Sequence, residues 1–159
     1  MAATTPFDPS SPRSDRCGDL SPGPASLAFV TPCAAVKDTT ARLLPAIERY
    51  RSRRIPEVQA AASDLGVDFL IFSGEFGLLE ASTLIPYYDH LLLLPEVKLH
   101  ATRVARQLRQ RQVDRILFFS DSPEADPLLL PYLSCLELAA DEAGVAVTFL
   151  TFASLGEAS

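Results

Sequence analysis

The run Val67–Ser73 constrains the fold more than any other stretch of this chain. It reads Val-Asp-Phe-Leu-Ile-Phe-Ser, so it is short, almost wholly apolar and rich in β-branched and aromatic residues. Such a strand is typical of a sheet that is covered on both faces. Gly74 and Gly77 follow and allow the backbone to turn sharply or to approach a ligand closely. The stretch therefore predicts a buried strand with a site at its end.

Three other apolar runs have the same character, and segments of helical periodicity separate them. The runs are Ser26–Thr31, Val113–Ser120 and Val145–Phe152. Helices are expected at Pro56–Leu65, Glu96–Gln110 and Leu129–Ala143. This alternation predicts a three-layer α/β fold, in which a mostly parallel sheet of about four strands has helices on both faces.

The two ends of the chain differ in composition from the alternating region. Residues 1–24 hold five prolines, four serines and two glycines but few large apolar side chains. A segment so poor in apolar surface cannot offset its ordering entropy, so a disordered tail is expected. Residues 154–159 are expected to fray, which leaves 25–153 as a single α/β domain.

Charge and cysteine content narrow the classes of function. The net charge of −6 disfavours non-specific attraction to nucleic acid or anionic membranes. Twelve of the fourteen basic residues are arginines, which form either solvated helix faces or a phosphate-contacting patch. No apolar run approaches the ~18–20 residues that cross a bilayer. Three widely spaced cysteines indicate reduced thiols, so a cytoplasmic protein without a membrane segment is expected.

Three loops should meet at one edge of the sheet, because ligands bind beyond the carboxyl ends of parallel strands. These loops are Pro32–Asp38, Gly74–His90 and Asp121–Asp126. The ligand-binding residues predicted in or beside them are Cys33, Lys37, Ser73, Gly74, Glu75, Gly77, Tyr88 and Asp121.

Asp89 and His90 are the candidate catalytic residues at this edge. A carboxylate beside an imidazole can act as a general base or orient a water, and Tyr88 can stack on a base. The alternative is that Asp89 caps a turn and Tyr88 packs. Similarly, the two glycines either cradle a phosphate or simply form a turn. Cys33 is either a nucleophile, with a pKa lowered by Lys37, or buried packing.

The two histidines are ten residues apart and have no further ligand at a metal-binding spacing. No metal site is therefore expected, and no cofactor motif is recognised, since the glycine spacing fits neither a dinucleotide fingerprint nor a Walker loop.

Several of these residues fall in short motifs that resemble a known family. The pattern Ser73-x-x-x-Gly77-Leu78-Leu79, followed by Tyr88-Asp89, resembles the Ser-Ala-x-x-Gly-Leu-Leu and Pro-Tyr-Asp elements of the small YaaA-like domains. The C-terminal domain of archaeosine synthase has a related layout.

Two upstream elements extend the resemblance. Thr31-Pro32-Cys33-x-x-x-Lys37 resembles the family's Cys-Ser-x-x-Lys, and Pro45-Ala46-x-x-x-Tyr50 resembles its Pro-Ala-x-x-Leu-Tyr. The resemblance runs from about residue 26 to residue 152. It implies a uracil-DNA-glycosylase-like fold and a link to nucleobase or nucleic-acid chemistry.

The sequence departs from the family pattern at four points. Ala34 replaces the serine after the cysteine, Lys37 is offset by one position, and Glu75-Phe76 replaces a pair that begins with lysine. Pro86 comes one place early, which leaves Tyr87 before Tyr88-Asp89.

Two functions remain open at this stage. The first is a pocket for a nucleobase, nucleotide or nucleic acid at the strand ends, with a degenerate glycosylase-like enzyme as one form of it. The second is a non-catalytic protein-interaction or oligomerisation module on the same fold. The lost serine and lysine favour the second function, whereas the retained Tyr88-Asp89 favours the first.

Overall fold

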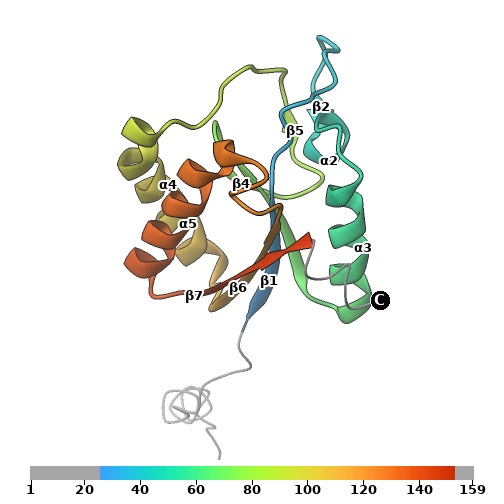
Figure 1. Cartoon of the computed structure of the whole chain (residues 1–159). Helices are drawn as coiled ribbons and strands as arrows, with labels where there is room; N and C mark the ends of the chain where they lie inside the picture. Colours follow the sequence, from blue (N-terminus) through green and yellow to red (C-terminus); the bar gives the residue numbers. More distant parts are fainter. Residues whose placement is uncertain (1–25, 153–159) are drawn as a thin grey trace, which may run out of the picture.

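The computed structural model describes residues 26–152, which build an α/β structure around a five-stranded sheet (Figure 1). The strand order is β4-β3-β1-β6-β7. Four of the strands run parallel: β1 (Leu27–Pro32), β3 (Asp68–Ser73), β6 (Arg115–Ser120) and β7 (Ala146–Thr151). Each lies within two residues of a predicted strand, so the mostly parallel sheet is confirmed.

The number of strands differs from the prediction of about four. The chain reverses after β3 and adds the short β4 (Gly77–Leu79), which pairs antiparallel with β3. A strand of three residues has too few positions to produce a recognisable periodicity, which is why the sequence does not predict it.

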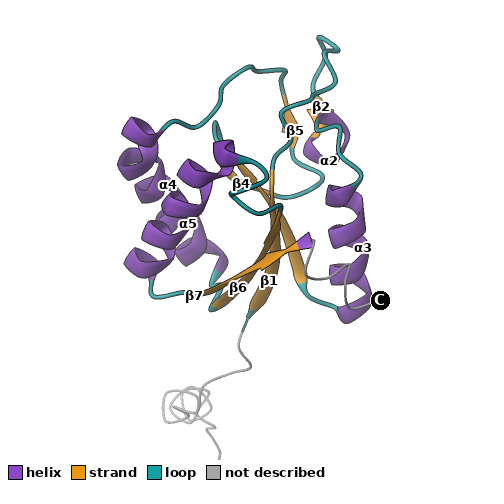
Figure 2. Cartoon of the chain, viewed as in Figure 1, coloured by secondary structure: helices purple, strands orange, loops and turns teal. Residues whose placement is uncertain are grey.

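The remaining elements are helices and one small ladder (Figure 2). The helices are α2 (Ala46–Arg49), α3 (Arg54–Leu65), α4 (Val97–Arg111) and α5 (Leu130–Ala143), with 3₁₀ turns η1 (Leu94–Glu96) and η2 (Pro127–Leu129). Strands β2 (Leu44–Pro45) and β5 (Leu84–Ile85) pair antiparallel. The three predicted helices are confirmed to within two residues at either end.

Successive residues of one strand pack against helices on opposite sides of the sheet. Val30 of β1 shares a buried cluster with Val104 of α4 and Leu136 of α5. Its neighbour Phe29 shares another cluster with Val58 of α3. Figure 1 shows α3 on one side of the sheet and α4 with α5 on the other. The strands therefore read as continuous apolar runs, because both of their faces are covered.

The topology creates a crevice at the carboxyl ends of β1 and β6. The chain passes from β1 to β3 on one side, and later enters β6 on the other side of β1. Such a reversal of direction is a topological switch point, where the loops after two neighbouring strands separate and leave room for a ligand.

Two predicted segments, the tail at 1–24 and the frayed end at 154–159, lie outside the described residues. Within 26–152 no helix combines the length and the apolar character needed to cross a membrane.

The reversal after β3 requires glycine at position 77. Gly77 has φ of +79°, in the left-handed region that L-residues avoid. A Cβ there would collide with the Gln107 side chain, which accepts a hydrogen bond from Leu78 N (2.8 Å) and donates one to Phe76 O (3.1 Å). Gly77 therefore lets α4 hold the turn through Gln107.

We predict that Gly77→Ala is more destabilising than Gly66→Ala. Gly66 has a similar φ of +70°, but its Cβ would meet nothing within 4 Å. The control, Gly66→Ala, should lower the free energy of unfolding by about 1–2 kcal/mol, because alanine is strained in the left-handed conformation. Gly77→Ala should lower it by about 1–2 kcal/mol more, because it also disturbs the Gln107 hydrogen bonds. Urea unfolding of both variants measures the difference, and equal losses would contradict the role given to Gln107.

Candidate functional site

A cavity of about 200 Å³ opens beyond the carboxyl end of β1, and we call it the β1 cavity. Four separate segments contribute polar groups to it: Cys33 and Lys37 after β1, Asp89 and His90 before α4, Asp126 before η2, and Tyr132 in α5. The rest of the lining is apolar and comprises Pro32, Ala34, Ala35, Leu91, Leu128 and Leu129. Four predicted site residues thus meet here.

Lys37, Asp89 and Asp126 are charged groups of this cavity that have no ionic partner among the described residues. None of the three makes a salt bridge with another residue between 26 and 152. The Lys37 ammonium lies 4.7 Å from the centre of the Tyr88 ring, a cation–π contact, and donates one long hydrogen bond to Ala35 O at 3.5 Å. Its other N–H donors have no partner within the described residues. Asp89 is exposed. The cavity therefore offers a ligand one cationic donor, Lys37, and two anionic acceptors, Asp89 and Asp126.

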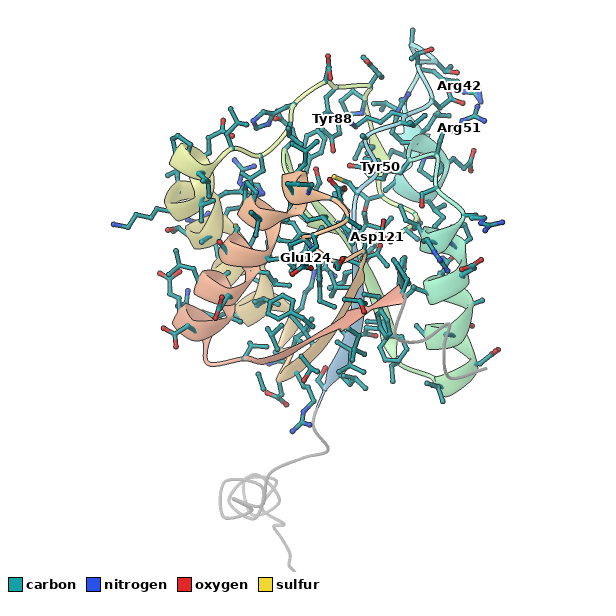
Figure 3. All side chains as sticks on the ribbon, viewed as in Figure 1. Arg42, Tyr50, Arg51, Tyr88, Asp121 and Glu124 are labelled. Carbon is teal, nitrogen blue, oxygen red and sulfur yellow. The ribbon has the colours of Figure 1, made fainter. Side chains whose placement is uncertain are left out.

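A buried hydroxyl network lies beside the cavity and holds Tyr88. Tyr88 Oη is 2.5 Å from Tyr50 Oη and 2.9 Å from Ser73 Oγ. Figure 3 labels the two tyrosines, which come from separate segments of the chain. Burial raises the pKa of both phenols well above the usual value, so both stay protonated. Ser73 and Tyr88 are not among the residues that line the cavity, so their role is to support its wall.

His90 is held between two carboxylates. Its Nδ1 lies 2.6 Å from Glu75 Oε1, and its Nε2 lies 3.0 Å from both oxygens of Glu96. Partial burial alone would lower the pKa of His90, but the hydrogen bonds to Glu96 and Glu75 outweigh burial and raise it. Both ring nitrogens of His90 are therefore occupied by carboxylates. Of the two candidate catalytic residues, only Asp89 has a functional group without a hydrogen-bond or ionic partner in the described part of the chain.

His90 also borders a second cavity of about 360 Å³, which we call the α4 cavity. Gly74 and Glu75 line it, together with His100 and Arg103 of α4. His100 Nε2 lies 2.9 Å from Ser73 O, and burial lowers the pKa of His100. Arg103 donates to Glu75 O at 2.6 Å, so α4 brings a positive charge to a loop that has none of its own.

Asp121 lies in a third cavity of about 200 Å³, which we call the β6 cavity. It is bounded by the ends of β1 and β6 and the first turn of α3, and Figure 3 labels Asp121 at the end of β6. Cys33 lines both the β1 and the β6 cavity. Six of the residues predicted at this edge are therefore distributed over three cavities and the wall beside them, and not gathered in one crevice. They are Cys33, Lys37, Glu75, Tyr88, Asp89 and Asp121.

Tyr132 is a site residue that the sequence does not predict. Cys33 Sγ lies 4.0 Å from Tyr132 Oη, and Leu92 N donates to the same oxygen at 3.2 Å. A Cβ at Gly74 would lie 2.6 Å from this oxygen, so Gly74 gives the phenol room to approach β3. In sequence, Tyr132 is one member of the apolar stripe of a helix, and only the fold reveals that its hydroxyl reaches β1.

No group of three or more His, Cys, Asp or Glu side chains within 26–152 could hold a metal ion. Comparison of the chain with protein-family models, curated proteins and solved structures found no match.

The cluster around His90 predicts a pH-dependent contribution to stability. A histidine whose pKa is raised on folding stabilises the protein fully below its unfolded pKa near 6.5, and this contribution is lost as the pH rises through the folded value. Because the three side chains are 35–42% exposed, the effect should be about 0.5–1 kcal/mol.

We therefore predict that His90→Gln destabilises the protein at about pH 5.5 and becomes almost neutral at about pH 9. Urea unfolding of the wild type and the variant at both values measures the difference in free energy. Glu75→Gln should weaken the pH dependence. A difference that grows with pH would contradict the arrangement described for His90.

Proposed function

We propose that this domain binds a nucleobase, or a nucleoside or nucleotide through its base, in the β1 cavity. The observation that carries the proposal is the meeting of unpaired Lys37 and Asp89 over a mostly apolar lining. A base needs both kinds of surface, since its faces are apolar and its edge carries hydrogen-bond donors and acceptors. At about 200 Å³ the cavity is smaller than the ~300–1,000 Å³ of drug-sized sites, which favours a ligand group of the size of one base.

The resemblance to the YaaA-like domains supports the same proposal. We propose that the chain is a cytoplasmic, three-layer α/β domain related to that group and to the uracil-DNA-glycosylase-like fold. Four residues in the matching motifs are Cys33, Lys37, Tyr88 and Asp89. Three of them line the β1 cavity and Tyr88 contacts Lys37.

A glycosylase-like reaction would use Asp89 and Lys37 in different roles. Asp89 would accept a proton from the water that attacks the anomeric carbon, so that a C–O bond forms while the C–N bond to the base breaks. Lys37 would donate a hydrogen bond to the departing base, which leaves with the bonding electron pair and then takes up a proton. If Lys37 does not reach the base, the same site is a binding pocket.

We predict that Asp89→Asn weakens binding of the preferred base or nucleoside about 10- to 100-fold, because one charge-assisted hydrogen bond to the ligand is lost. Isothermal titration against free bases and nucleosides measures the affinity, and thermal unfolding measures stability. Stability should change little, because Asp89 has no hydrogen-bond or ionic partner within residues 26–152 that would be lost.

The matched control is Asp64→Asn, which makes the same chemical change at an exposed position near the end of α3. It should leave both affinity and stability unchanged. Unaltered affinity in the Asp89 variant, or an absence of binding by every base and nucleoside, would reject the proposed site.

One observation favours the second function, an oligomerisation module. Among the described strands β7 lies at the edge of the sheet, and its sequence Ala-Val-Thr-Phe-Leu-Thr carries neither charge nor proline. Phe149 is 40% exposed. Edge strands usually carry charges, prolines or bulges that prevent pairing with another chain. A second copy is the partner that fits, because an antiparallel pair centred on Thr148 would oppose Val147 and Phe149 without meeting a like charge.

We predict under this second function that Thr148→Lys converts a dimer into a monomer, since the pairing would bring two lysines together. Light scattering during gel filtration measures the mass. Thr102→Lys, on the exposed side of α4, is the control and should leave the mass unchanged. A wild-type protein that is monomeric at all soluble concentrations would reject the oligomerisation module.

A further inference from the structure

We infer that the β6 cavity is the subsite for the sugar of a ribonucleoside whose base occupies the β1 cavity. This inference rests on the proposed function and extends it from a base to a ribonucleoside. The two cavities share six lining residues, so they are adjoining lobes of one crevice at the switch point between β1 and β6. The shared residues are Pro32, Cys33, Ala34, Ala35, Asp126 and Leu129. A ligand that enters one lobe is therefore next to the other.

A buried hydroxyl without a partner points to a ligand in this second lobe. Thr31 is 1% exposed and lines the β6 cavity, yet its Oγ1 has no hydrogen-bond partner within residues 26–152. Buried polar atoms are nearly always hydrogen-bonded, and an exception calls for an explanation such as a bound molecule. Thr31 follows Phe29 on the same face of β1, the face that α3 covers, so its hydroxyl lies beneath the first turn of α3.

The other polar groups of the lobe select the class of ligand. Asp121 and Asp126 contribute carboxylates, which accept hydrogen bonds. Asp126 Oδ1 already accepts from Leu128 N at 3.2 Å, whereas its other oxygen has no partner in the described part of the chain. A vicinal diol offers two O–H donors to such acceptors, as the ribose hydroxyls do to a carboxylate in dinucleotide-binding folds.

A phosphate fits the same lobe poorly. The first turn of α3 and Arg54 would attract an anion, but two carboxylates oppose it. The Arg54 guanidinium is also already occupied, because it pairs with Glu57 at 3.4 Å and lies 4.6 Å from the centre of the Phe152 ring. The lobe therefore favours the neutral sugar of a nucleoside over the phosphate of a nucleotide.

The test compares four series of probes on the wild-type chain by isothermal titration. They are the ribonucleosides adenosine, inosine, cytidine and uridine, the corresponding free bases, the 2′,3′-dideoxynucleosides and the 5′-monophosphates. The preferred ribonucleoside should bind about tenfold tighter than its base, because the sugar adds hydrogen bonds to carboxylates. The dideoxynucleoside should lose that gain, and the monophosphate should bind no tighter than the nucleoside.

Two variants test whether the higher affinity of the ribonucleoside comes from the β6 cavity. Asp121→Asn and Thr31→Val should each weaken binding of the ribonucleoside about tenfold and leave binding of the free base unchanged. Thr31→Val should also keep or raise the melting temperature, because a buried methyl replaces an unpaired hydroxyl. The control is Glu124→Gln, which makes the same chemical change in the same loop; Figure 3 labels this residue. The Glu124 carboxylate lines none of the three cavities, so the variant should bind like the wild type.

The outcomes separate the inference from the function on which it rests. If bases bind and ribonucleosides bind no tighter, or if the monophosphate binds tightest, the sugar subsite is wrong while the base site stands. If neither bases nor ribonucleosides bind, both are wrong. Selective loss of ribonucleoside affinity in the two variants supports the subsite.

Discussion

The arrangement at the carboxyl edge of the sheet depends on the hydrogen bonds of Ser73, the last residue of β3. Its hydroxyl accepts from the N–H groups of Glu75 and Phe76 at 3.0 Å and lies 2.9 Å from Tyr88 Oη. Its carbonyl oxygen is 2.9 Å from His100 Nε2. One fully buried residue thus joins β3, the turn after it, the segment before α4, and α4 itself. Loss of this hydroxyl would take a hydrogen-bond partner from the N–H groups of Glu75 and Phe76 and from Tyr88 at once, although Tyr88 would keep its bond to Tyr50.

The position of Asp89 follows from this network. Tyr88 is held through its hydroxyl, and its ring packs edge-on against Phe76 at 5.2 Å between centroids. Asp89 comes next in the chain, so a backbone held at Tyr88 presents it at the mouth of the β1 cavity. On the opposite side, Cys33 N donates to Phe72 O at 2.9 Å, which continues the pairing of β1 with β3 beyond the strand. The cavity therefore lies between two segments that are both tied to β3, one by the Cys33 backbone and the other by the Tyr88 hydroxyl.

The sequence predicts the parallel sheet well, because burial on both faces leaves a strong signal in strands such as Val67–Ser73. It also predicts the segments that reach the carboxyl edge, since that follows from strand direction alone. It predicts only in part which side chains meet: Cys33, Lys37, Asp89 and His90 share the β1 cavity as expected, but two contacts at this edge do not follow from the sequence. Glu75 and His90 are fifteen positions apart, and Cys33 and Tyr132 are ninety-nine apart. No periodicity relates such pairs, so only the folded backbone brings them together.

The sequence likewise does not predict that a buried group such as Thr31 Oγ1 lacks a hydrogen-bond partner within the described residues. A threonine at the end of a strand is an ordinary choice for its β-branched side chain, and its hydroxyl usually finds a partner. Thr31 is unusual because its hydroxyl has no hydrogen-bond partner among the described residues, and only the folded structure can reveal this.

The turn after β3 is where the sequence differs most from the YaaA-like motif that it resembles. Glu75-Phe76 stands where that motif has a pair beginning with lysine, and both side chains have defined partners. Glu75 lies 2.6 Å from His90, and Phe76 packs on Tyr88. The positive charge that the loop itself lacks comes from α4, through the hydrogen bond of Arg103 to the Glu75 carbonyl. The Glu75 carboxylate pairs with His90, and the Lys37 ammonium makes no salt bridge with a carboxylate within residues 26–152. An acidic residue in this turn is therefore compatible with a cation that is available to a ligand at the proposed site.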